Sequence, residues 1–321
     1  TLSARFEHVI CSYATMRKDL QSLCREVGWS QWVALGVSGK GTTARHAIDL
    51  EAAIAFLPAF ETLDPRLYAE AMDWCIQFAA DYVSVAALKT FLALMPAAHR
   101  TKFVSVANIV NAQGGTKWPT ASEPGSDEAG HARDRAPLPQ FRPSGKSQRR
   151  IGNPAAVQLR GRKIFGVSAR ADMLVALAML GNAAGNPEWT HVNTFSGLGY
   201  QKRNLSHALT DLCDGGVVHA HKVGNTVRYE FVQAEPVRKL LQPLPETAGV
   251  PWAPLMALAA ALLDVQARTH NKSQTTQGVE VNNVLSALRP LLARNQIAVP
   301  SVQAGDPWPQ LLPWLARELQ P

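Results

Sequence analysis

The sequence predicts a mainly α-helical protein of several domains, and three observations support this fold class. Apolar residues recur at intervals of three and four over most of the 321 residues, which is the period of an amphipathic helix. A period of two, typical of a strand, is confined to residues 218–231. Between residues 112 and 155 the composition changes to glycine, proline, serine and charge, which indicates a segment with little to bury. We therefore expect a helical N-terminal domain (1–111), a flexible basic linker (112–160), a central domain (161–234) and a helical C-terminal domain (235–321).

The N-terminal helices are predicted from apolar stripes and from residues that start and stop helices. Residues 50–56, 66–78 and 83–95 each carry apolar side chains at helical spacing. Asp64 followed by a proline is a typical helix start, and Pro96 is a typical stop. These signals predict a bundle of short helices before the linker.

The basic character of the chain is concentrated in the linker. The whole chain has a net charge of +7, whereas residues 131–163 alone carry nine basic side chains against Asp134, a net charge of +8. The nine are Arg133, Arg135, Arg142, Lys146, Arg149, Arg150, Arg160, Arg162 and Lys163. Cations interleaved with glycine, proline and serine are typical of arms that contact phosphates without reading sequence. The alternative is a solubilising spacer.

The central segment contains helical patterns followed by a hairpin pattern. Ser168 is a good N-cap for a helix over 169–180, a shorter helix is expected near 190–196, and the stretch 199–218 carries a leucine ladder that ends at two glycines. Two alternating runs then flank the pair Gly224-Asn225, which predicts a β-hairpin with its turn at these residues.

The segments SARADMLVALAML, LGYQKRNLSHALTDLCDGGVV and HKVGNTVRYEF follow one another over residues 164–232. Together they resemble the winged helix-turn-helix domain of bacterial regulators of the MarR and ArsR kind. The resemblance implies three helices and a β-hairpin wing at the centre of the chain. It also implies that the third helix enters the major groove of DNA while the wing contacts the minor groove or phosphates.

The third helix of this segment has two different faces on a helical wheel. Leu205, Ala208, Leu209 and Leu212 fall on one face, whereas Arg203, His207 and Thr210 lie opposite. Arginine can pair with guanine and asparagine with adenine, so the polar face carries donors suited to reading bases; the alternative is an ordinary solvated face. The predicted DNA-contacting residues are Gln201, Lys202, Arg203, Asn204, Ser206 and His207 in the helix, Lys222, Asn225, Thr226 and Arg228 in the hairpin, and Arg142, Lys146, Arg149 and Arg150 in the linker.

No enzyme, cofactor or metal motif is predicted. The run 36–43, GVSGKGTT, lacks both the glycine spacing of a phosphate-binding loop and the hydroxyl residue directly after its lysine. His219 and His221 share a strand face and could bind a metal, but no third ligand lies near them in the sequence. The four cysteines are widely spaced and contain no C-x-x-C pair, so we expect them to behave as small apolar residues in a reducing compartment.

The C-terminal helices suggest self-association. The segment 254–268 is apolar nearly all round, which requires burial on several sides. We expect a homodimer with these helices in its interface; the alternative is burial within the chain against 279–295, a segment that Pro290 should kink or break.

Taken together, these features predict a non-enzymatic, DNA-binding transcriptional regulator. Since no signal peptide is evident, we expect a cytoplasmic protein associated with the nucleoid, with double-stranded DNA as its partner and a protein or small-molecule effector bound through the helical domains. Two alternatives stay open: a DNA-bound adaptor or replication and partition factor whose output is assembly, and a winged domain used for protein contacts.

Overall fold

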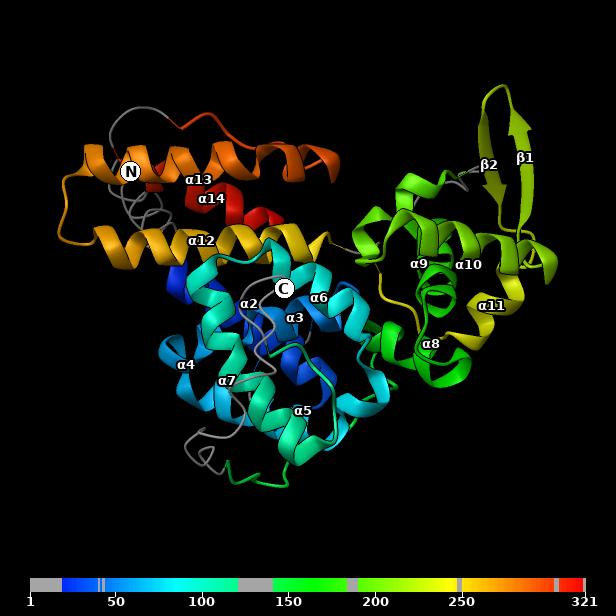
Figure 1. Cartoon of the computed structure of the whole chain (residues 1–321), viewed down its shortest axis with the longest axis horizontal. Coiled ribbons are helices and arrows are strands. Elements are labelled where there is room, and N and C mark those ends of the chain that lie inside the picture. Colours follow the sequence, from blue (N-terminus) through cyan, green and yellow to red (C-terminus); the bar gives the residue numbers. More distant parts are fainter. Residues whose placement is uncertain are drawn as a thin grey trace, which may run out of the picture.

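The computed structural model describes residues 19–39, 41, 44–120, 141–183, 190–246, 250–302 and 306–319, and within these ranges it is mainly helical with one two-stranded sheet (Figure 1). The mainly α fold class is therefore confirmed. The elements before residue 121 are α2 (Leu20–Leu35), α3 (Leu50–Phe56), η1 (Leu57–Ala59), α4 (Phe60–Leu63), α5 (Pro65–Tyr82), α6 (Val85–Leu94) and α7 (Ala97–Gly114). Those after residue 140 are η3 (Pro154–Ala156), α8 (Val157–Phe165), α9 (Ala169–Ala183), η4 (Val192–Leu198), α10 (Lys202–Asp214), β1 (His219–Val223), β2 (Thr226–Glu230), α11 (Ala234–Leu240), α12 (Trp252–Thr269), α13 (Gln274–Arg294) and α14 (Trp308–Glu318).

The chain packs around two hydrophobic cores that lie side by side along its longest axis (Figure 1). One core joins α2–α7 with α12–α14, and we call these elements the helical body. The other joins α8–α11, η4 and the hairpin β1–β2, which we call the helix–hairpin module. The first core draws residues from both ends of the described chain, so the separate N-terminal and C-terminal domains expected from the sequence are one body.

Helix α12 is the reason that the two ends of the chain share a core. Its residues from Trp252 to Ala260 are all buried, as are Leu262 and Val265. It packs against α3, α2 and α6 on one side and against α13 on the other. The apolar surface that suggested a dimer interface is therefore covered within the chain, which is the alternative considered above, and the homodimer stays a prediction.

Most helix starts follow directly from the local sequence. The side chain of Asp64 accepts the backbone N–H of Leu67, and the Ser168 hydroxyl accepts that of Ala171, which confirms both predicted N-caps. Pro96 separates α6 from α7 as expected. Pro290, in contrast, does not end α13, because the carbonyl that it leaves without a donor belongs to Ser286, which is exposed and can be hydrated.

Several residues of the segment predicted to be a flexible linker are packed against the body. Helix α7 extends to Gly114, and Trp118 is buried with its ring stacked on Phe103 at a centroid distance of 5.9 Å. Phe141 and Ile151 pack against the same core. Residues 121–140, which include Arg133 and Arg135, lie outside the described residues.

Cys24 and Cys75 are free and fully buried, in agreement with the expectation that they act as small apolar residues. Burial raises the pKa of the Cys24 thiol to about 12, so it stays protonated at neutral pH. Among the helices that the structure describes, none is both long and apolar enough to cross a membrane.

Candidate nucleic-acid interface

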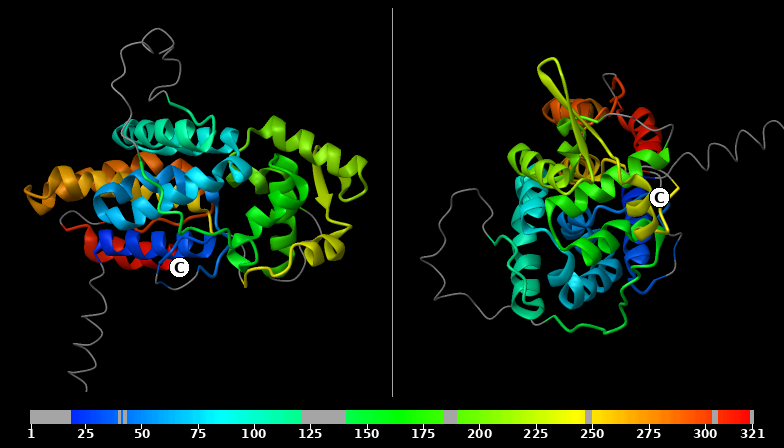
Figure 2. Two further views of the ribbon diagram at one scale, coloured as in Figure 1. Left: turned by 90° about the horizontal axis from the view of Figure 1, so that it is seen from below. Right: turned by 90° about the vertical axis from the view of Figure 1, so that its right-hand side faces the viewer.

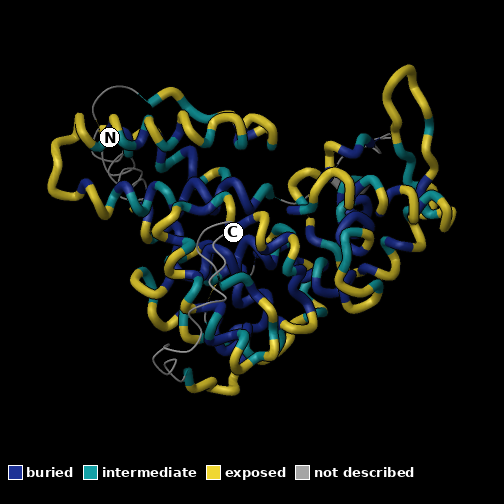
Figure 3. The backbone as a smooth tube through the Cα atoms, in the orientation of Figure 1, coloured by how far each residue is buried: buried dark blue, intermediate teal, exposed yellow. Residues whose placement is uncertain are grey.

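Helix α10 separates its buried and exposed faces as the sequence predicted. Its leucine ladder and Ala208 are buried in the module core, whereas Lys202, Arg203, Asn204 and His207 are exposed (Figure 3). The Arg203 Nε lies 3.5 Å from the His207 Nε2, so these two side chains run together along the exposed face. The face therefore offers donors to solvent along the first two turns of the helix.

The start of α10 is open to an incoming acceptor. Gln201 occupies the N-cap position, but its side chain accepts no N–H from the first turn. Amides at a helix start need an acceptor and carry a partial positive charge. Together with Lys202 and Arg203, this end of the helix favours an anion such as phosphate.

The β1–β2 hairpin stands beyond α10 at the outer edge of the module, and its tip is exposed (Figures 1 and 3). The expected turn is present at residues 224–225, with Gly224 at φ 60°. Tyr229 anchors the hairpin through two backbone hydrogen bonds with Thr190, both 2.8 Å. The hairpin is thus held at its base and free at its tip, where Asn225 and Thr226 lie.

The strand register places the two predicted hairpin cations on opposite faces. Lys222 pairs with Val227, whereas Arg228 pairs with His221, the neighbouring position on β1. Successive residues of a strand point to opposite faces, so Lys222 and Arg228 cannot contact one surface together. A ligand at either face of the hairpin would therefore meet only one of these two cations.

A buried ion network fixes the module to the body and holds the approach to α10. Arg162 of α8 is fully buried between Glu51 of α3 and Asp172 of α9, with N–O distances of 2.6 Å to each. Its guanidinium also donates to the backbone carbonyl of Tyr82 at 2.6 Å. The hydroxyl of Tyr200, two residues before α10, donates to Asp172 at 2.8 Å.

The electrostatics of this network follow from burial and charge. Burial alone would lower the pKa of Arg162, but the carboxylates of Glu51 and Asp172 raise it well above its ordinary value. Burial, and then the charge of Asp172, raise the pKa of the Tyr200 hydroxyl, which stays a donor at neutral pH. At neutral pH Arg162 therefore stays charged and the Tyr200 hydroxyl stays protonated.

The basic segment identified in the sequence is only partly available to a ligand. The guanidinium of Arg162 is buried and hydrogen-bonded within the ion network. Arg160 donates to the backbone carbonyls of Leu241, Ile151 and Pro243. These two cations hold α8 in place because a buried guanidinium must satisfy its donors within the protein. They do not belong to a phosphate-binding surface.

The linker cations from Arg142 to Arg150 lie away from α10. The residues around Ser147 are bound to α5, since the backbone N–H groups of Gly145 and Ser147 donate to the carboxylate of Asp73. Arg149 lies 3.6 Å from Asp81 and over the ring of Phe78. Figure 1 shows this segment along the bottom of the helical body and the hairpin at the upper right, on the module; the two views of Figure 2 also keep them apart. Arg142, Lys146 and Arg150 are exposed there, and DNA contact by these residues stays a prediction.

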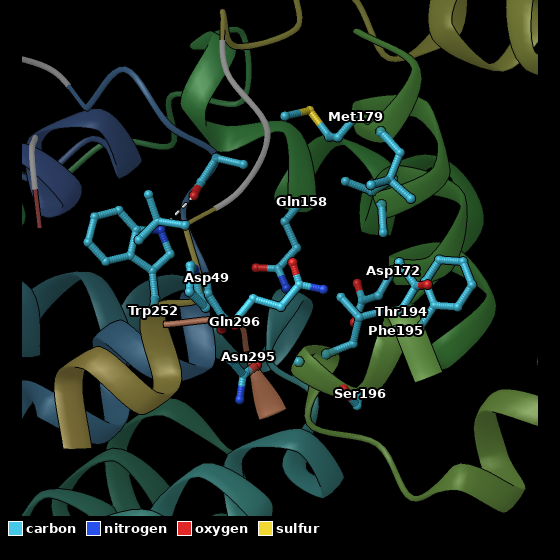
Figure 4. A pocket seen from close by; sticks show the side chains of 18 of the residues that line it. Asp49, Gln158, Asp172, Met179, Thr194, Phe195, Ser196, Trp252, Asn295 and Gln296 are labelled. Carbon is cyan, nitrogen blue, oxygen red and sulfur yellow. Dashed lines mark hydrogen bonds between the residues drawn. The ribbon is translucent and has the colours of Figure 1, made fainter. Parts of the chain in front are cut away.

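A pocket of about 550 Å³ lies at the junction of the module and the body (Figure 4). One wall carries Thr194, Phe195 and Ser196 of η4, and the other carries Trp252 and the residues that follow α13. Among the latter, Gln296 has a φ of 60°, a left-handed conformation that is uncommon for a residue with a side chain. Nothing in the sequence indicated this pocket, because its walls come from segments about 100 residues apart.

No family model, no curated protein and no solved structure matches this chain. Its function must therefore be argued from the geometry of the site.

Proposed function

We propose that this chain binds double-stranded DNA through α10 and the β1–β2 hairpin, in the manner of a winged helix, and acts as a transcriptional regulator. The observation that carries the proposal is the exposed, donor-rich start of α10 next to a projecting hairpin. A helix of 13 residues is roughly 20 Å long, and the major groove admits one helix. In such a complex Arg203 and Asn204 would face base edges.

The hairpin extends the contact beyond the groove that α10 would occupy. Asn225 and Thr226 at its tip and Arg228 on one face provide donors for phosphate or for the minor groove. The buried network at Arg162 and Tyr200 supports the proposal, because a helix that reads bases must be held in a fixed orientation relative to its scaffold.

Selection of a preferred site from random duplexes, followed by anisotropy titrations, tests the proposal. Arg203→Ala should weaken binding to the preferred site by about 1–3 kcal/mol and relax the preference at one base pair. Arg317→Ala, which removes an exposed arginine from α14 of the body, is the matched control and should change neither quantity.

The outcomes separate the proposal from its alternatives. A defined motif that depends on Arg203 supports a regulator. Binding that grows with duplex length but has no motif favours an adaptor that coats DNA. If the wild-type chain and Arg203→Ala bind duplexes equally well, or if neither binds, the exposed face of α10 does not read DNA.

We further propose that the junction pocket binds a small-molecule effector. Its volume lies within the range of typical ligand sites, and its two walls belong to the two packing units. A ligand there would contact η4, which leads into α10, together with Trp252 of the body. Ser196→Trp should fill the pocket, so compounds that raise the melting temperature of the wild type should not raise that of the variant; equal shifts would exclude this site.

A further inference from the structure

The β1–β2 hairpin brings three metal-ligating side chains together on one face. His219 and His221 are two residues apart on β1, so both point to the same side, and Glu230 pairs directly with His219 on β2. Their ligating atoms all lie within 4.8 Å of one another. Strand pairing brings Glu230, which lies nine residues beyond His221 in the sequence, beside the two histidines.

We propose that His219, His221 and Glu230 form a binding site for a divalent transition metal ion of the zinc class. Two imidazoles and one carboxylate are nitrogen and oxygen ligands that suit Zn²⁺, whereas Mg²⁺ and Ca²⁺ prefer sites made of oxygen alone. Three protein ligands leave a fourth coordination position open to water or another ligand. The site is independent of the DNA-binding proposal.

The distances in the hairpin fit a metal after small side-chain rotations. The His221 Nε2 lies 2.9 Å from the Glu230 Oε2, and the two imidazole centroids are 4.7 Å apart. Bonds of about 2.0–2.1 Å in tetrahedral geometry place ligand atoms roughly 3.3–3.4 Å from one another. The longest separation must therefore shrink by about 1.5 Å, which side chains on an exposed hairpin can achieve by rotating about χ1 and χ2.

Access and charge set the character of this site. His219 is exposed, and the side chains of His221 and Glu230 are 30% and 44% exposed, so a hydrated ion can reach all three. Arg228 pairs with His221 and lies on the same face, where its positive charge opposes a bound cation. This face of the hairpin therefore carries three metal ligands and one positive charge that lowers the affinity for a metal ion. Substitutions can remove the ligands and the charge separately.

Zinc titration of the metal-free full-length chain, in the absence of DNA, tests the proposal. Calorimetry should detect one zinc site in the wild type. The affinity of this site for zinc should fall at least tenfold in each of His219→Gln, His221→Gln and Glu230→Gln. Arg228→Gln should strengthen it, because the opposing charge is gone. Val227→Thr changes an exposed residue on the other face and serves as the control that should leave it unchanged.

The spectrum of the cobalt-substituted chain identifies the ligands directly. Co²⁺ should give visible absorption bands of four-coordinate geometry in the wild type and in Val227→Thr, but not in the three ligand variants. Zinc should also slow amide hydrogen exchange between residues 219 and 230, since it links the two strands. Equal zinc affinity in the wild type and the three ligand variants would overturn the proposal, and so would an equal loss in Val227→Thr.

Discussion

Replacing Arg162 with methionine should be among the most damaging single changes in the described part of the chain. The substitution keeps much of the side-chain volume but removes five hydrogen bonds: two to Glu51, two to Asp172 and one to the carbonyl of Tyr82. Both carboxylates are 1% exposed, so they would remain buried without a cation. Removing one partner from a buried ion pair typically costs 3–5 kcal/mol, and here two partners are left, so we expect a loss of at least about 3–5 kcal/mol in the free energy of unfolding.

The chain offers a matched control for this change. Arg170 lies 3.4 Å from Asp211, but the two side chains are 58% and 51% exposed. An ion pair in solvent contributes about 0–1 kcal/mol, so Arg170→Met should lower the free energy of unfolding by less than about 1 kcal/mol. Urea denaturation followed by circular dichroism and tryptophan fluorescence measures both variants.

A triple variant separates the loss of charge balance from the loss of packing. In Glu51→Gln/Arg162→Met/Asp172→Asn none of the three charged groups of the network remains, so much of the stability should return. The reasoning is refuted if Arg162→Met costs no more than Arg170→Met. It is also refuted if the triple variant is less stable than Arg162→Met alone, because the damage would then not come from unpaired carboxylates.

Three further predictions concern the body and the linker. Burial lowers the pKa of His99 to about 4, although the hydrogen bond that His99 donates to the Ala55 carbonyl opposes this shift. The neutral side chain therefore contributes to the free energy of unfolding above pH 6.5, and this contribution is lost as the pH falls towards 4. Between pH 6.5 and pH 4 the free energy of unfolding should therefore fall by up to ~3 kcal/mol less in His99→Gln than in the wild type. Identical pH profiles of the free energy of unfolding in the two proteins would contradict this. Trp118→Ala should cost about 3–5 kcal/mol because the ring is 3% exposed, whereas a truly flexible linker would show no change in urea denaturation. Two sets of glutamine substitutions compare the linker with the proposed interface, namely Arg142, Lys146, Arg149 and Arg150 against Lys202, Arg203, Lys222 and Arg228. Anisotropy titrations over a salt series should show that the linker set reduces the salt dependence of DNA binding less than the interface set does. A larger reduction by the linker set would mean that DNA reaches across the body.

Local sequence was sufficient to predict the elements of the candidate interface. The leucine spacing of α10 and the alternation around Gly224-Asn225 depend on the chain's own helical and strand periods, and caps such as Asp64 act within three residues. The register that places Glu230 opposite His219 also follows from the two-residue turn. Proximity in the sequence alone does not reveal this ligand, because Glu230 lies nine residues beyond His221.

Charge counted along the chain was a poor guide to where charge is available. Arg160 and Arg162 sit in the most basic segment of the sequence, yet both are buried and bound within the protein. The signal that could have revealed this is Glu51, an acidic residue in the otherwise apolar run LEAAIAF. A carboxylate at a core position requires a buried cation, but the sequence does not say which one.

The sequence by itself determined which segments are helices, which are strands, and which face of α10 is apolar, because these properties arise from contacts within a few residues. Only the tertiary structure decided that the first and last described helices share one core, that the supposed linker binds Asp73, and that Arg162 meets Glu51 across 111 positions. Such pairings depend on how the shapes and charges of distant elements fit together. Periodicity carries no information about that fit, since many helices present the same apolar stripe and only close packing selects among them.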